Sequence, residues 1–117
     1  MEVHAITKNV RMSAQKMREV VRQIQGLPAD HAIAVLAVVP RKGARVAAKT
    51  LKSAKANAED LKTHKPQYHD LKLDQLRVKE AVAQRAAILR RFTPKARGSA
   101  GPILKRNCHV KITLSDD

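Results

Sequence analysis

Two short stretches of the sequence bring together residue types that can do covalent chemistry. Ser13 and Lys16 have the Ser-x-x-Lys spacing of penicillin-interacting acylases, and Cys108 is followed directly by His109, a thiol beside an imidazole. Those acylases need further motifs and a chain much longer than 117 residues. Ser13 instead precedes an amphipathic run, where serine commonly caps a helix, and neighbouring residues of a strand face opposite sides. We therefore expect Ser13 to be an N-cap and Cys108 to be a small core residue.

Other residues offer little for a metal, cofactor or active site. His64 and His69 are five apart across Pro66 and lack a clear third ligand, so an ordinary loop is the favoured interpretation. The four glycines do not form a phosphate-binding loop. An enzyme acting on RNA would need an acid–base pair, but the acids are scattered and only Glu80 lies on the strand leading to the basic segment. We predict no enzyme activity, no cofactor, no metal and no small-molecule substrate.

Positive charge is the strongest signal in the chain. Lys and Arg number 24 against 10 Asp and Glu, a formal net charge of +14. The segment from Arg85 to Lys111 carries cations and no acid, whereas surfaces that serve only solubility mix both signs. Tyr68 and Phe92 are the only aromatic residues, so base stacking cannot dominate. The sequence predicts a nucleic-acid-binding protein that contacts mainly phosphate and sugar.

Length, cysteine content and the lack of long apolar runs narrow the class of protein further. The length fits one domain, the single cysteine gives no disulfide framework, and no segment approaches the roughly 18 apolar residues of a membrane span. The first residues lack the plan of a signal peptide. We expect a soluble, intracellular protein of one domain, residues 1–117, that does not act at a membrane.

The elements that position these cations begin with a strand and two helices. Residues 2–11 are rich in β-branched side chains and predict a strand. Apolar residues then recur at helical spacing over residues 14–25, and Gly26 follows as the residue that ends the helix. Residues 28–38 fit either a helix or a buried strand, and the proline near their start favours a helix.

The clearest helix spans residues 41–61. One face holds small apolar residues and a separate stripe holds cations, which we expect in solvent or on phosphate. The apolar face is Ala44, Ala47, Leu51, Ala54, Ala58 and Leu61, and the stripe is Arg41, Arg45, Lys49, Lys52 and Lys55.

Alternating patterns predict two further strands, joined by a long hairpin over about residues 85–106. In the first strand, Leu76, Val78, Glu80 and Val82 are expected on one face and Arg77, Lys79, Ala81 and Ala83 on the other. The second strand has one face made of Leu104, Arg106, Cys108, Val110, Ile112 and Leu114. Its other face is polar and largely basic, and consists of Ile103, Lys105, Asn107, His109, Lys111 and Thr113. Prolines and glycines between them predict an irregular tip, on which Phe92 is either a hydrophobic anchor or a base-stacking residue.

Three motifs in order resemble the large-subunit ribosomal protein twenty-two family. The C-terminal motif is carried by Arg90, Arg91, Pro94, Lys95, Ala96, Arg97, Gly98 and Ala100, then Ile103, Lys105, Arg106, His109 and Val110. "VRMSAQK" resembles the family's first helix and "LKSAKANAE" its third. The resemblance implies an α+β fold in which three helices pack on a three-stranded antiparallel sheet with one long extended β-hairpin.

The same resemblance implies partners and a place of action. They are large-subunit ribosomal RNA, neighbouring ribosomal proteins and, along the polypeptide exit tunnel lined by the hairpin, the nascent chain. Macrolide antibiotics bind nearby in this family. The bacterial type implies a cytoplasmic ribosome, with an organelle ribosome as the alternative.

The chain departs from the family pattern at four places. Ser99 stands where the family usually has Arg, and Gly101 and Pro102 replace a more polar pair. Residues 85–87 replace an acid followed by Gly-Pro, and Asn107 and Cys108 replace Thr-Ser.

From charge and resemblance together we predict two sets of site residues. The RNA-binding set is Lys8, Arg11, Lys16, Arg41, Arg45, Lys49, Lys52, Arg90, Arg91, Lys95, Arg97, Lys105, Arg106 and His109. The tunnel-facing tip is Phe92, Thr93, Pro94, Gly98, Ser99, Ala100 and Gly101. An architectural DNA-binding protein with a proline-tipped arm in the minor groove is the alternative function.

Overall fold

A computed structural model describes residues 1–117, and its elements follow the two periodicities of the sequence. They are β1 (Glu2–Val10), α1 (Ala14–Val21), α2 (Ala29–Val38), α3 (Lys42–His64), β2 (Arg77–Arg85), β3 (Leu89–Pro94), β4 (Ala100–Lys105) and β5 (Cys108–Ser115). Short 3-10 turns lie at Pro66–Tyr68, Leu73–Gln75 and Ala96–Gly98. No helix is long and apolar enough to cross a membrane.

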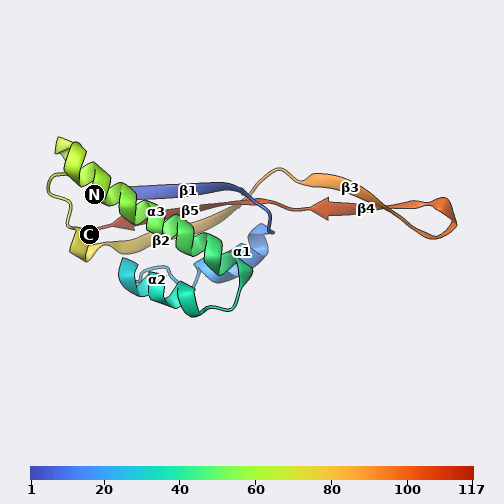
Figure 1. Cartoon of the computed structure of the whole chain (residues 1–117), viewed down its shortest axis with the longest axis horizontal. Helices are drawn as coiled ribbons and strands as arrows, with labels where there is room; N and C mark the ends of the chain where they lie inside the picture. The colour runs from blue at the N-terminus through green and yellow to red at the C-terminus, as the bar shows by residue number, and fades with distance from the viewer.

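A three-stranded antiparallel sheet forms the body, in the order β1-β5-β2. Helix α3 packs on β1 and β5, α1 packs on β2, and α2 packs on α3 (Figure 1). Strands β3 and β4 pair separately as a hairpin that extends away from the body. The predicted α+β fold, with three helices on a three-stranded sheet and one long hairpin, is confirmed.

The core is made of small and medium apolar side chains, as the composition requires. Ala44, Ala47, Ala54 and Ala58 of α3 are at most 1% exposed, so the helix backbone lies close to the sheet. The predicted apolar face of this helix is confirmed, with Leu61 partly buried at its end. Burial also raises the pKa of the Cys108 thiol, which is the expected small core residue.

Helix α1 begins as predicted but ends four residues earlier than predicted. The Ser13 hydroxyl accepts a hydrogen bond from the Lys16 amide at 3.4 Å, which confirms the N-cap. The helix ends at Val21, because Gly26, at φ +81°, donates its amide to the Val78 carbonyl at 2.8 Å. This bond to β2 draws the chain out of the helix before Gly26.

The predicted faces of β2 are wrong beyond Lys79. The register with β5 shifts between Val78 and Glu80, which is a β-bulge. One extra residue exchanges the two faces, so Ala81 and Ala83 are buried in the core while Glu80 is exposed.

The strand predicted over residues 103–114 is interrupted at Arg106 and Asn107. Leu104 is therefore 46% exposed on the hairpin, whereas Cys108 is buried in the sheet. The polar face of β5 is partly covered, because Thr113 is only 7% exposed. At the interruption, the Ala86 amide donates to the Asn107 carbonyl, and the Asn107 side chain donates to the Ala87 carbonyl, each at 3.1 Å.

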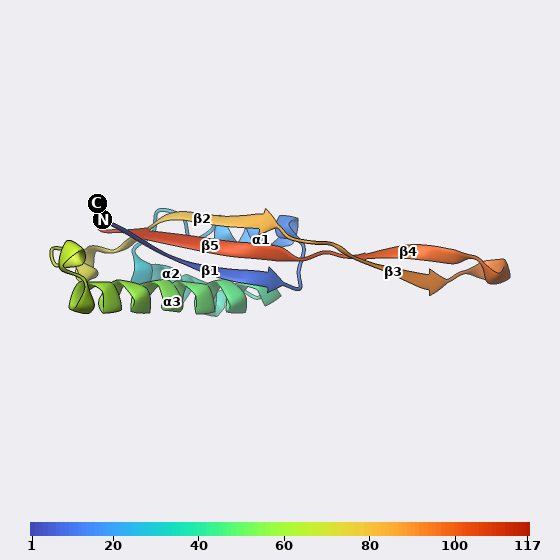
Figure 2. The ribbon, with the colours of Figure 1, turned by 90° about the horizontal axis from the view of Figure 1, so that it is seen from above.

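The β3–β4 hairpin, called the arm below, gives the molecule its length of 67 Å against widths of 28 and 16 Å. No helix packs on it, and it stands clear of the body in both views (Figures 1 and 2). At its tip Arg97 and Gly98 have φ values of 60° and 74°, which reverse the chain. The two chain termini lie together at the opposite end of the molecule (Figure 2).

Candidate nucleic-acid interface

Most of the positive charge is not neutralised within the chain. Of the Lys and Arg side chains, only Arg41, Lys55 and Lys79 form an ion pair with a carboxylate. Seven of the ten acids belong instead to the segments at the end that holds the termini: Glu2, Glu59, Asp60, Asp70, Asp74, Asp116 and Asp117. The arm and its root are left as the positive end of the molecule.

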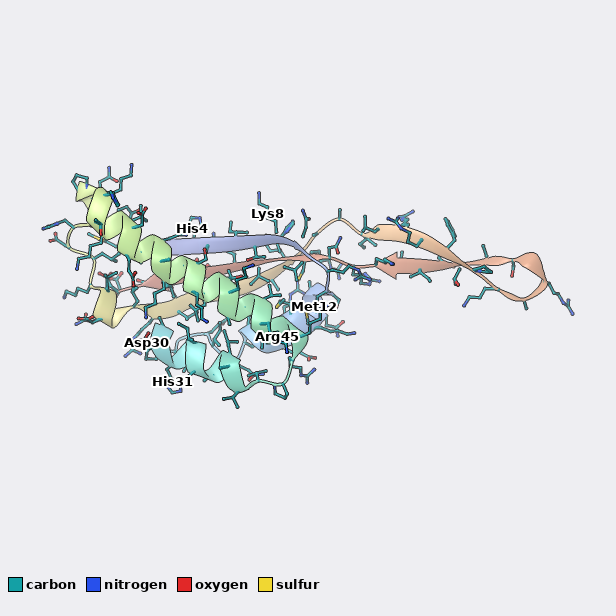
Figure 3. All side chains as sticks on the ribbon, viewed as in Figure 1. His4, Lys8, Met12, Asp30, His31 and Arg45 are labelled. Atoms are coloured by element: carbon teal, nitrogen blue, oxygen red, sulfur yellow. The ribbon has the colours of Figure 1, made fainter.

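A surface cavity of about 510 Å³ lies at the root of the arm and is lined by five cations. They come from three places in the chain: the turn after β1 with the start of α1, the start of α3, and the residue after β4. The cations are Arg11, Lys16, Arg41, Lys42 and Arg106, and Met12, Ser13 and Leu104 complete the lining. Figure 3 shows Met12 where α1 and the start of α3 approach one another.

Backbone carbonyls rather than acids hold this cavity together. The Arg11 guanidinium donates to the Arg106 carbonyl at 2.8 Å, and the Lys42 ammonium group donates to the Arg11 carbonyl at 3.5 Å. Arg41 alone has an acidic partner, Glu19, at 3.3 Å. Both of those side chains are more than half exposed, so the pair is weak.

A second cavity of about 360 Å³ adjoins the first and shares Ser13 and Arg106 with it. Arg18 and Arg85 add two cations to its lining. The Arg18 side chain donates to the Ala83 carbonyl at 3.2 Å, which ties α1 to β2.

The predicted stripe on α3 leads away from this root. Arg45, Lys49 and Lys52 are exposed on the side of the helix that faces away from the core, while Lys55 is partly buried and pairs with Asp30 at 2.5 Å. Lys8 is exposed on β1, near the end of the strand that leads to the root (Figure 3).

Cations lie on both faces of the arm. Opposite residues of an antiparallel pair share a face, so Arg91 with Ile103 and Lys105 with Leu89 lie on one side, and Arg90 with Leu104 lies on the other. The Lys95 side chain lies over Gly101, and a Cβ added at Gly101 would lie 2.6 Å from Cε of Lys95. Arg97 is at the tip. The predicted arm residues are therefore spread around the hairpin and do not form one stripe.

Two predicted residues have distinct surroundings. Phe92 is 75% exposed, opposite Pro102, so the structure does not favour a role as a hydrophobic anchor within the chain. His109 accepts a hydrogen bond at Nδ1 from the Asn9 amide at 3.0 Å. This bond requires a ring that is unprotonated at Nδ1, and it holds His109 against the irregular end of β1.

The structure thus brings Arg11, Lys16, Arg41 and Arg106 together and leaves the other predicted residues separate. Sequence reasoning missed three cations that line the two cavities: Lys42, Arg18 and Arg85. Lys42 adjoins Arg41 in the sequence and could have been included on that ground. Arg85 begins the acid-free basic segment and could have been included on that ground. Arg18 gave no local signal, because only the packing of α1 on β2 brings it to this site.

The chain is similar to known proteins over nearly its whole length. The model of the family described as ribosomal protein L22p/L17e matches residues 5–115. The large ribosomal subunit protein uL22 of Opitutus terrae is 47% identical over 116 residues, which cover 99% of this chain and 96% of that protein. The protein of the same name from Akkermansia muciniphila is 44% identical over 116 residues, 99% of this chain and 97% of its own length.

Proposed function

Because the chain belongs to the ribosomal protein L22p/L17e family of the large ribosomal subunit, we propose that it binds large-subunit ribosomal RNA as a structural component of the subunit. The observation that carries the proposal is the arm with its root. The arm has no acid and no helix packs on it, and its root is lined by cations of which only Arg41 pairs with an acid. A charged hairpin of this kind needs a polyanion as its packing partner.

The contacts in this proposal are mainly to phosphate and sugar. The RNA-binding residues are those predicted from the sequence, from Lys8 to His109, joined by the cations that line the two cavities at the root. No aromatic residue lines either cavity, and Phe92 is the single ring on the arm. Affinity then comes from Lys and Arg on the RNA backbone, and selectivity comes from the shape of the folded RNA.

The arm supports a second part of the proposal, which is that the hairpin lines the tunnel through which the nascent polypeptide leaves. Its tip, with Phe92 to Pro94 and Gly98 to Gly101, would contact the tunnel lumen and the nascent chain, near the site of macrolide binding. The globular part would contact RNA and neighbouring ribosomal proteins and would support subunit assembly. Residues 1–117 act as one RNA-binding unit in this proposal, in the cytoplasmic ribosome of a bacterial cell.

Sucrose-gradient fractionation of a tagged copy tests the proposal. We expect the tagged protein to sediment with the large subunit and its precursors. Its absence from both would overturn the proposal.

A binding competition between folded ribosomal RNA and duplex DNA separates this function from an architectural role on DNA. We expect the RNA to displace the DNA. Preference for the duplex would contradict the proposal and would favour the architectural role on DNA.

A further inference from the structure

The two cavities at the root of the arm are neighbours, and together we call them the root groove. Their linings share Ser13 and Arg106 and extend from the start of α3, past the residue that follows β4, to the end of β2. It therefore crosses the base of the arm and does not follow the arm's length. Its walls come from segments that are far apart in the sequence.

We propose that the root groove binds the sugar–phosphate backbone of a single RNA strand that crosses the base of the arm. This inference rests on the proposed function, because it takes RNA as the ligand, and it adds where the primary contact lies. The root groove, and not the arm, supplies most of the affinity of the free protein.

Charge is the first argument. Five cations line the first cavity, and Glu19, paired with Arg41 at 3.3 Å, is the only acid that contacts them. Lys16, Lys42 and Arg106 have no carboxylate partner. Mutual repulsion among these groups is relieved when a polyanion lies between them.

The second argument is that the root groove is already assembled in the free protein. Arg11 is fixed by its bond to the Arg106 carbonyl, Lys42 reaches the Arg11 carbonyl, and Arg18 is fixed by the Ala83 carbonyl. The cations of the arm make no comparable bond to the body of the protein. Binding at the root groove therefore orders fewer side chains than binding at the arm and loses less conformational entropy.

The lining also indicates which part of a nucleotide is bound. Met12, Leu104 and Ile88 provide apolar surface, and no aromatic ring is present on which a base could stack. Sugar and phosphate fit such a lining, so recognition at the root groove is independent of base identity.

Filter binding of bacterial large-subunit ribosomal RNA over a series of KCl concentrations tests the proposal. The root variant is Lys16→Gln with Lys42→Gln, since the Lys16 ammonium group has no partner within the chain and that of Lys42 contacts only the Arg11 carbonyl, at 3.5 Å. The control variant, Lys65→Gln with Lys72→Gln, removes the same charge at the end that holds the termini, and a third variant, Lys95→Gln with Arg97→Gln, removes it at the tip. Thermal melts of all variants show whether the fold is retained.

We expect the root variant to weaken binding at least tenfold near 0.1 M salt. The slope of log K against log salt concentration should become shallower by about 1.4 to 1.8, because each lost phosphate contact contributes roughly 0.7 to 0.9. The control variant should stay within about twofold of the wild type, and the tip variant should fall between them.

The possible failures are distinguishable. Equal losses in the root and control variants would mean that only net charge matters, and a larger loss in the tip variant would place the main contact on the arm. Either result overturns the root-groove proposal and leaves RNA binding intact. If the wild type does not prefer the RNA to duplex DNA, the proposed function itself fails.

Discussion

The side chain of Asp116 joins three parts of the chain at the end opposite the arm. Its Oδ1 accepts from the amino group of Met1 at 2.9 Å, and its Oδ2 accepts from the Lys72 amide at 3.2 Å. The first strand, the loop before β2 and the C-terminal residues are thereby connected. Glu2 and Lys79 form an adjacent ion pair between β1 and β2.

These contacts predict a bounded pH range for the link between the termini. The hydrogen bond from the amino group lowers the pKa of Asp116 below its ordinary value of 3.8, and the same bond raises the pKa of the Met1 amine above 8.0. A carboxylate with a lowered pKa stabilises the fold above its ordinary pKa, and this stabilisation is lost as the pH falls through the lowered value. An amine with a raised pKa stabilises the fold below its ordinary pKa, and this is lost as the pH rises through the raised value.

We therefore expect the link to be intact between about pH 4 and pH 8 and to open on both sides. NMR hydrogen exchange of the Lys72 amide, expressed as a protection factor, measures it. Asp116→Asn keeps the shape of the side chain without its charge, so its protection should be lower and nearly independent of pH. An Asp116 carboxyl that titrates at its ordinary pKa would contradict this account.

At the scale of elements, the hairpin tip depends on one glycine more than on the other. Gly98 has a φ of +74°, which an L side chain adopts with strain, although its position is open in space. Gly101 has no such φ, and an added Cβ would meet only the side chain of Lys95. The two glycines therefore have different roles.

We predict that Gly98→Ala destabilises the paired form of the arm by about 1 kcal/mol, because alanine in the left-handed region carries that cost. Gly101→Ala should displace Lys95 and leave the pairing nearly unchanged. Cross-strand NOEs between Arg91 and Ile103 report the paired population in each variant. Equal populations in both would show that the left-handed turn at the tip is not required.

The sequence predicted those parts of the fold whose information is local. The cap at Ser13 and the small apolar face of α3 depend on residues within a few turns of one another, and both are present. The end of α1 and the bulge at Lys79 depend on backbone bonds between Gly26, Val78 and β5, which no local pattern contains.

The candidate site follows the same division. Arg11, Lys16, Arg41 and Arg106 were predicted one by one from their charge and from the resemblance to a family. In the structure these residues share a cavity with Lys42 and adjoin a second cavity that is lined by Arg18 and Arg85. This grouping depends on how β1, α1, α3 and the arm meet. Charge can be read from a sequence, whereas the grouping of charges requires the fold.

At the scale of the whole molecule, the core and the arm are separate in their packing. No residue between Ala83 and Cys108 is buried, so all core residues belong to the body. The arm also accounts for the radius of gyration of 17.7 Å, since a compact chain of this length would have about 13 Å.

We predict that the body folds without the arm. In a variant with residues 87–106 replaced by Asn-Gly, β2 and β5 are joined by a tight turn at the position where Arg85 pairs with Cys108. No buried apolar contact is removed, so the free energy of unfolding in urea should stay within about 1 kcal/mol of the wild type. The radius of gyration from small-angle X-ray scattering should fall to about 13 Å. A loss of several kcal/mol would show that the arm stabilises the body through contacts absent from the structure, and the separation of core from arm would then be wrong.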